Sequence, residues 1–229
     1  MPAQSHDTVW TVLRAASCGD PAARASFAHS YAALIRSYLQ HRWRSRALAA
    51  QIEDSVQDVF VECYKPGGVL ERADPERGGF RALLYGVVRN VARRHEERAA
   101  KNGERQPADS VYLDEQPHQA EALSCMFDRS WAMSLLHEAV KRHEAAAAAG
   151  DADGRLRLRI LRLRHDQGIP VRDIAAALGE ADVAAVHNGY RRARRDFAAH
   201  LRAVVAASTG VTGPAVDDEC RRLTELLGS

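Results

Sequence analysis

Residues 80–95 read FRALLYGVVRNVARRH, and this stretch decides the fold. Its apolar residues recur every three or four positions, at Phe80, Leu83, Leu84, Val87, Val88 and Val91. A helix with 3.6 residues per turn places such residues on a single face. The stretch therefore predicts an amphipathic helix of about five turns, buried on one side and rich in arginine on the other.

Two further helices are expected before this one. Asp20 followed by Pro21 is typical of a helix start, because Asp accepts hydrogen bonds from the first free amides and proline suits the first turn. Residues 52–64 carry a second apolar stripe, which ends at the sequence KPGG. A loop over residues 66–79 then leads into the next helix.

The helical pattern resumes after a polar stretch. Residues 102–119 are rich in Pro, Asp, Gln and Gly and show no periodicity, which predicts a linker. Residues 155–164 alternate like a strand but also line one helix face, and we expect a helix because the chain offers no partner strand. Residues 169–179 and a long segment from about residue 182 are two helices around a glycine turn, the pattern of a helix-turn-helix.

The predicted fold is all-α, with two small helical domains joined by a flexible linker and a helix-turn-helix in the second domain. The expected parts are a first domain over 1–104, an acidic linker over 105–125, a second domain over 126–205 and a C-terminal extension over 206–229. No stretch approaches the roughly 20 apolar residues of a membrane span, and residues 1–20 lack a signal-peptide pattern. We therefore expect a cytoplasmic protein with no membrane partner.

The charges form blocks that the net charge of +2 conceals. Residues 1–104 and 151–202 are net basic, and the segments between and after them are net acidic. Of the 32 basic residues 29 are arginine, a bias that a GC-rich genome alone can produce. The clustering is more specific, because four arginines lie within 89–98 and four within 191–195. Dense cationic fields of this kind suit polyanions such as nucleic acids.

The sequence contains no pattern of a catalytic or metal site. His95-Glu96 is followed by Ala99 where a zinc protease carries a second histidine, and no phosphate-binding glycine loop is present. The segment DADG at 151–154 has its glycine too early for a calcium loop. The four cysteines are scattered without a CxxC pair, which favours reduced thiols. We expect no catalytic residue, no cofactor and no metal ion.

Three stretches, taken in order, resemble the extracytoplasmic-function (ECF) sigma factors of bacterial RNA polymerase. Residues 53–60, EDSVQDVF, are similar to the family's polymerase-binding helix, and residues 80–92 resemble its promoter-melting helix. Residues 172–194 resemble its C-terminal helix-turn-helix, from RDIA to YRRAR. The pattern departs from the family's after Gly179, where the turn is one residue longer, and at Gly189, where the family often has arginine.

The resemblance implies a role for each of three surfaces. The residues that would bind the polymerase are Asp54, Gln57 and Asp58. The residues that would hold the non-template strand of the −10 promoter element are Arg77, Arg81, Arg89, Asn90, Arg93 and Arg94. The residues that would bind the −35 element are Arg172, Ala185, His187, Asn188, Arg191, Arg192 and Arg195. The implied partners are bacterial core RNA polymerase and promoter DNA, with an anti-sigma factor as a potential third.

Two other functions remain open at this point. A helix-turn-helix transcriptional regulator could bind duplex DNA by itself without acting as a sigma subunit, which leaves the helices at 53–60 and 80–92 without a role. A helical protein-interaction module with incidental basic faces is the other alternative. Binding to core polymerase in the absence of DNA would separate a sigma factor from both.

Overall fold

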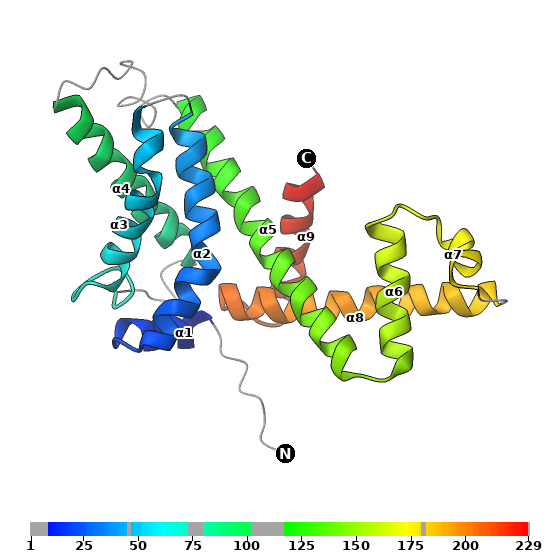
Figure 1. Cartoon of the computed structure of the whole chain (residues 1–229). Coiled ribbons are helices and arrows are strands. Elements are labelled where there is room, and N and C mark those ends of the chain that lie inside the picture. Colours follow the sequence, from blue (N-terminus) through cyan, green and yellow to red (C-terminus); the bar gives the residue numbers. More distant parts are fainter. Residues whose placement is uncertain (1–8, 45–46, 73–79, 102–116, 180–181, 229) are drawn as a thin grey trace. The chain divides into compact units, whose positions relative to one another are not determined.

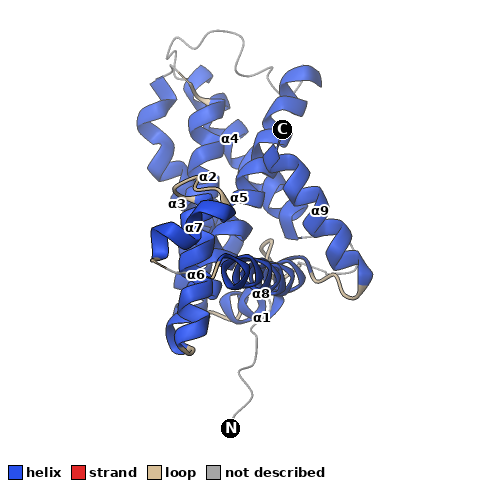
Figure 2. Ribbon diagram, turned by 90° about the vertical axis from the view of Figure 1, so that its right-hand side faces the viewer, coloured by secondary structure: helices blue, strands red, loops and turns tan. Residues whose placement is uncertain are grey.

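The computed structural model describes residues 9–44, 47–72, 80–101, 117–179 and 182–228. All regular structure in these residues is helical, as Figure 2 shows, which confirms the all-α prediction. The elements are α1 (Val9–Ser17), α2 (Pro21–Arg42), the short 3-10 helix η1 (Ala47–Gln51), α3 (Ile52–Tyr64), α4 (Phe80–Lys101), α5 (Pro117–Ala149), α6 (Ala152–His165), α7 (Val171–Leu178), α8 (Val183–Thr209) and α9 (Pro214–Gly228). The chain divides into two compact units. Unit 1 is Met1–Ser134 with Ala206–Ser229, and unit 2 is Leu135–Val205.

Unit 1 is built on α2, α3 and α4, which lie side by side, with α1 packed against α2 (Figure 1). The start of α2 is the predicted one, since the Asp20 side chain accepts a hydrogen bond from the amide of Ala22 at 3.0 Å and Pro21 follows it. The apolar stripe of α4 is buried, also as predicted. The three helices therefore follow directly from local sequence signals.

An aromatic cluster fills the centre of unit 1. The ring centroid of Phe80, the first residue of α4, lies 5.7 Å from Phe27, 5.3 Å from Tyr31 and 6.1 Å from Trp131. Tyr31 and Trp131 stack with an interplanar angle of 13°. Each such pair contributes about 0.5–1.5 kcal/mol beyond the burial of apolar area. Because Trp131 belongs to α5, the cluster fixes the first part of α5 to unit 1.

The helix α5 begins earlier than the sequence predicted. Residues 117–125, expected to belong to the linker, form the first turns of α5, and the expected boundary at residue 126 falls inside that helix. Proline-rich composition was a poor guide here, because Pro117 occupies the first helical position, where the missing N–H costs no hydrogen bond. Leu123 is 5% exposed and anchors these turns. Along the chain, the boundary from unit 1 to unit 2 falls between Ser134 and Leu135, within α5.

Unit 2 contains α7 and α8, the two helices at the place where the sequence predicts a helix-turn-helix. Gly179 ends α7 with a φ of 72°, a left-handed conformation that glycine adopts without steric cost. Asp182 then caps α8, because its side chain accepts a hydrogen bond from the amide of Ala185 at 3.0 Å. The predicted helix over 155–164 is confirmed as α6. Ile160 of α6, Ile174 of α7 and Val186 of α8 form the buried centre of this unit.

Candidate protein and nucleic-acid interfaces

The helix α3 has an exposed strip on the side opposite its buried residues. Its buried residues are Ser55, Val56, Val59 and Cys63. On the other side Asp54 and Gln57 are exposed, and Val61 is 62% exposed, the largest value for a large hydrophobic residue in the described part of the chain. Asp54, Gln57 and Val61 follow one another at helical spacing and form one strip, the α3 strip. A carboxylate, an amide and an apolar group on a rigid helix can bind a cationic protein surface.

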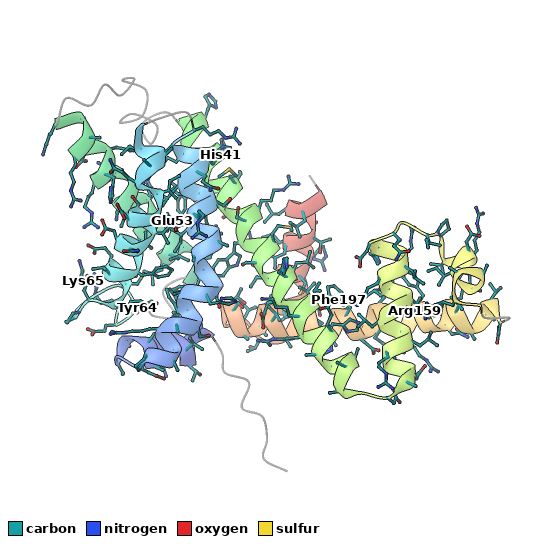
Figure 3. All side chains as sticks on the ribbon, in the orientation of Figure 1. His41, Glu53, Tyr64, Lys65, Arg159 and Phe197 are labelled. Carbon is teal, nitrogen blue, oxygen red and sulfur yellow. The ribbon has the colours of Figure 1, made fainter. Side chains whose placement is uncertain are left out.

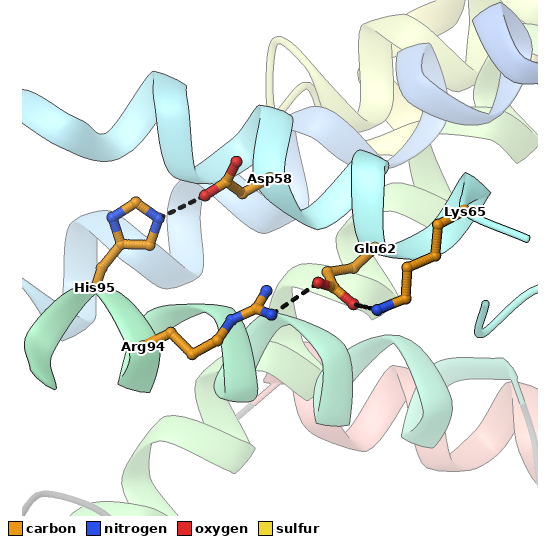
Figure 4. A network of polar contacts seen from close by, with 5 residues as sticks. All are labelled: Asp58, Glu62, Lys65, Arg94 and His95. Atoms are coloured by element: carbon orange, nitrogen blue, oxygen red, sulfur yellow. Dashed lines mark hydrogen bonds and ion pairs between the residues drawn. The ribbon is translucent and has the colours of Figure 1, made fainter. Parts of the chain in front are cut away.

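Asp58, also predicted to bind the polymerase, contacts α4. Its Oδ2 atom lies 2.9 Å from Nε2 of His95 (Figure 4), and Nδ1 of His95 lies 3.3 Å from Oε1 of Gln51. The side chain of Asp58 is still 44% exposed. Asp58 can therefore orient His95 and remain accessible at the border of the α3 strip.

A second link joins α3 and α4 one turn further along (Figure 4). Nη1 of Arg94 donates to Oε1 of Glu62 at 2.7 Å, and Nζ of Lys65, at the end of α3 (Figure 3), donates to Oε2. Hydrogen bonds from Lys65 and Arg94 lower the pKa of Glu62 below its ordinary value. The two links hold the helix predicted to bind polymerase against the helix predicted to bind the −10 element.

A buried ion pair fixes α4 from the opposite side. Nε and Nη2 of Arg42 donate to the two carboxylate oxygens of Glu96 at 2.7 and 2.9 Å, and Nε1 of Trp43 donates to Oε1 at 2.8 Å. The side chains of Arg42 and Glu96 are 0% and 1% exposed. Charge-assisted hydrogen bonds to both oxygens offset the cost of removing the charges from water. The pair therefore stabilises the packing of α4 against the last residue of α2.

The residues predicted for the −10 element differ in their surroundings. Three of them are exposed on α4: Asn90, Arg93 and Arg94. Arg89 is half-buried, and Arg81 forms an ion pair with Asp128 of α5, where burial lowers the pKa of Arg81 from its ordinary value. Arg77 lies outside the described residues. One turn before Asn90, a Cβ on Gly86 would meet no neighbouring group within 4 Å. The outward face of α4 is thus open at this turn.

All the residues of α8 predicted for the −35 element are exposed. They are Ala185, His187, Asn188, Arg191, Arg192 and Arg195. Arg172 at the start of α7 is 80% exposed and lies 3.5 Å from a carboxylate oxygen of Asp173. In the described residues, no carboxylate lies within ion-pair distance of Arg191, Arg192 or Arg195. These guanidinium groups are available to an external anion.

Arg194 belongs to the same surface, although the sequence prediction includes it only in the arginine cluster and not among the −35 residues. Its guanidinium lies 5.9 Å from the centroid of the Tyr190 ring, and it lines a shallow hollow with Arg191 and Arg195. The hydroxyl of Tyr190 in turn lies 3.4 Å from Nε2 of His165. Tyr and Arg four residues apart on a helix are neighbours, so the spacing itself could have indicated this contact.

Gly189 brings α8 close to α6. A Cβ on Gly189 would lie 2.9 Å from Cδ1 of Ile160, which is shorter than a van der Waals contact. A side chain at position 189 would therefore require the terminal methyl group of Ile160 to shift.

No three His, Cys, Asp or Glu side chains gather as a metal site would require, as far as the structure describes the chain. None of the helices in the described residues combines the length and the apolar character needed to cross a bilayer. Comparison with protein-family models, with curated proteins and with solved structures finds no match. Function is therefore inferred from the residues and contacts described above.

Proposed function

We propose that this protein is an RNA polymerase sigma factor of the ECF type. It binds core polymerase through α3, holds the non-template strand of the −10 element with α4, and contacts the −35 element through α7 and α8. It acts in the cytoplasm and carries out no catalytic reaction itself. An anti-sigma factor would restrain it by covering one of these surfaces.

The observation that carries the proposal is the α3 strip. Asp54, Gln57 and the 62% exposed Val61 lie on the side of α3 opposite its buried residues, on a helix that two polar links hold against α4. An exposed apolar group beside a carboxylate fits a protein partner with a basic surface. A regulator that binds only duplex DNA would have no use for this strip, which is why the sigma reading is preferred.

The chemistry of α8 supports sequence-specific contact with duplex DNA. A recognition helix in the major groove presents its N-terminal half to base edges. Asn188 can bond bidentately to adenine, His187 can donate to guanine, and Ala185 can touch a thymine methyl. Arg191 and Arg192 follow one turn later and neutralise phosphates.

Energetics require that the polymerase takes part in promoter opening. Stacking in duplex DNA is worth on average about 1.4 kcal/mol per step, so opening some ten steps costs on the order of 14 kcal/mol. Each base captured on an aromatic or arginine surface returns roughly 1–3 kcal/mol. Asn90, Arg93 and the neighbouring arginines can therefore retain a few bases but cannot hold a bubble open alone.

The decisive experiment is binding to core polymerase without DNA, measured by gel filtration of the full chain. Asp54→Lys should weaken this binding by about tenfold or more, because it reverses a charge within the α3 strip. Asp173→Lys makes the same change on an exposed residue of α7 and should leave core binding unaltered.

Run-off transcription from a genomic promoter library with core enzyme would then identify the promoters. Stable opening of linear promoter DNA by the purified chain alone would contradict the proposed mechanism. No binding of the wild-type chain to core polymerase would contradict the proposed function as a whole.

A further inference from the structure

The ring of His95 joins three elements of unit 1. His95 lies on α4 and is 7% exposed, so its neighbours cover almost the whole ring. Its Nε2 atom lies 2.9 Å from Oδ2 of Asp58 on α3 (Figure 4), and its Nδ1 atom lies 3.3 Å from Oε1 of Gln51 at the end of η1. The ring of Trp43, the residue after α2, lies 6.1 Å away between centroids. Both ring nitrogens of His95 therefore have a polar partner.

The chemistry of these partners decides where the ring carries hydrogen. An ionised carboxylate only accepts hydrogen bonds, so Nε2 of His95 donates to Asp58. Gln51 can serve Nδ1 in either of its states. Its amide oxygen accepts from a protonated Nδ1, and its NH2 group, once the amide turns, donates to a neutral one. The ring can therefore take up or release a second proton while both hydrogen bonds are kept.

Asp58 is held at one carboxylate oxygen and open at the other. Its side chain is 44% exposed, and within the described residues Oδ1 has no hydrogen-bond or ion-pair partner. Asp58 follows Gln57 directly and therefore borders the α3 strip. A carboxylate that one contact already orients loses less conformational entropy when a partner binds its other oxygen. The contact with His95 thus prepares Asp58 for a basic group of a partner protein.

The charge that a proton would add to His95 acts chiefly on Asp58. The other two contacts of the ring, Gln51 and Trp43, are uncharged. Next to His95 in α4, the two charged side chains are already compensated by residues of other helices. These ion pairs are Arg94 with Glu62 and Glu96 with Arg42. The carboxylate of Asp58 is therefore the charged group that faces the ring.

We propose that His95 is a positioning residue for Asp58 and makes the binding of core polymerase depend on pH. This inference rests on the proposed function, because Asp58 belongs to the surface assigned to the polymerase. Neutral His95 orients the carboxylate and leaves its negative charge available to a basic partner. Protonated His95 adds a positive charge beside the carboxylate, which neutralises it and repels the same partner. Histidine makes this change between about pH 5 and 8, so binding weakens as the pH falls.

Titration of fluorescently labelled core polymerase with the full chain at about pH 8 and pH 6 tests this role. The wild type should bind about five- to tenfold more weakly at the lower pH. His95→Gln keeps a donor group but cannot take up a proton, so its affinity should change by less than about twofold. His29→Gln is the matched control, because it makes the same change at an exposed histidine of α2 and should keep the pH dependence of the wild type.

Asp58→Asn tests the same coupling without a change in the buried ring. Asparagine carries no charge, so this variant should bind about fivefold more weakly than the wild type at pH 8. At pH 6 the two should differ little, because the wild-type carboxylate is then already neutralised. A contact that only holds α3 against α4 would instead give the same loss at both pH values. If His95→Gln does not fold, the comparison of Asp58→Asn with the wild type decides alone.

The possible failures are distinguishable. The positioning role is overturned if the wild type binds core polymerase equally well at both pH values, or if a folded His95→Gln keeps the pH dependence of the wild type. It is also overturned if Asp58→Asn loses the same factor at both pH values. Each of these results leaves the proposed function intact. Failure of the wild type to bind at either pH would overturn the proposed function and this inference together.

Discussion

The arginines of α4 and those of α8 look alike in the sequence but differ in their partners. On α4, Arg81 and Arg94 are each paired with a carboxylate from another helix, Asp128 and Glu62. On α8, Arg191, Arg192 and Arg195 have no such partner in the described residues. An arginine that its own chain neutralises must give up that contact to bind a ligand. Two similar arginine clusters can therefore stabilise the fold in one unit and be available to bind anions in the other.

The largest effect is expected for Arg42, which is buried and donates hydrogen bonds to both carboxylate oxygens of Glu96. Glu96→Ala would leave the buried guanidinium of Arg42 without its bidentate carboxylate, which should cost about 3–5 kcal/mol of unfolding free energy. Urea denaturation followed by circular dichroism measures the loss. Glu97→Ala is the matched control, since Glu97 is 51% exposed and lies 3.7 Å from Arg93, and it should cost about 0.5 kcal/mol or less. Similar losses from both variants would contradict the structural role of the buried pair.

Next in size is the loss of a base contact from α8. Asn188→Ala should cost about 1–3 kcal/mol of binding free energy at one base pair of the −35 element and little at the others. Fluorescence anisotropy with duplexes that differ at single positions measures the profile. A uniform loss over all duplexes would mean that Asn188 contacts the backbone.

The salt dependence of DNA binding distinguishes an arginine without a carboxylate partner from one that already forms an ion pair. Arg192→Ala should lower the slope of log affinity against log salt by about 0.9 on duplex DNA, because one phosphate contact is lost. Arg94→Ala should lower it by clearly less than the about 0.7 expected for a full contact with single-stranded DNA, because Glu62 already neutralises Arg94. If Arg94→Ala lowered the slope by the full value of about 0.7, the arginines of α4 and α8 would not differ in their availability to phosphate.

Alanine substitutions at two glycines inside helices should change the stability by smaller amounts, and the two changes should differ. Gly86→Ala meets open space and should stabilise the protein by about 0.5–1 kcal/mol, since alanine favours a helix. Gly189→Ala should stabilise the protein less than Gly86→Ala or destabilise it, because its Cβ would lie 2.9 Å from Cδ1 of Ile160. Thermal unfolding compares the two variants. Equal stabilisation by both would show that α8 and α6 pack more loosely than described.

The smallest effect concerns pH and is confined to unit 2. His143 of α5 is buried against His200 and against Phe197, which Figure 3 labels on α8, and within the described residues neither ring nitrogen of His143 has a hydrogen-bond partner. Burial and the nearby His200 lower the pKa of His143, although Asp196 opposes the shift. The unfolded chain then binds a proton that the folded chain excludes, so stability should fall as the pH drops below about 6.5.

Urea denaturation at several pH values measures this dependence. His143→Phe should flatten the profile below neutrality, whereas His137→Phe, at an exposed position of the same helix, should leave it unchanged. An identical profile for wild type and His143→Phe would assign the dependence to other groups.

Local signals made much of the fold predictable. The cap at Asp20, the apolar stripe from Phe80 and the glycine after α7 each act over a few residues, and each element is present. The exposure of Asn188 and its neighbours also follows from helical periodicity. These features depend on contacts within one or two turns.

What could not be predicted depends on contacts between distant residues. The pairing of Arg81 with Asp128 joins positions 47 residues apart, and no local pattern indicates it. The same holds for the start of α5, which the aromatic contact of Trp131 stabilises against the polar composition of its first turns. The packing of α9 in unit 1 likewise depends on distant contacts, which involve two buried side chains of α9 and a glycine beside Trp10.

The contact between Gly189 and Ile160 bears on how the proposed promoter preference could be re-engineered. Because the two helices touch at a residue without a side chain, a helix transplanted from another protein in place of α8 would require Cδ1 of Ile160 to move unless position 189 stays glycine or Ile160 is shortened as well. Swapping α6, α7 and α8 together avoids that conflict. The natural unit of exchange is then the three-helix module, and single substitutions at Ala185, His187 and Asn188 are the safer route to altered specificity.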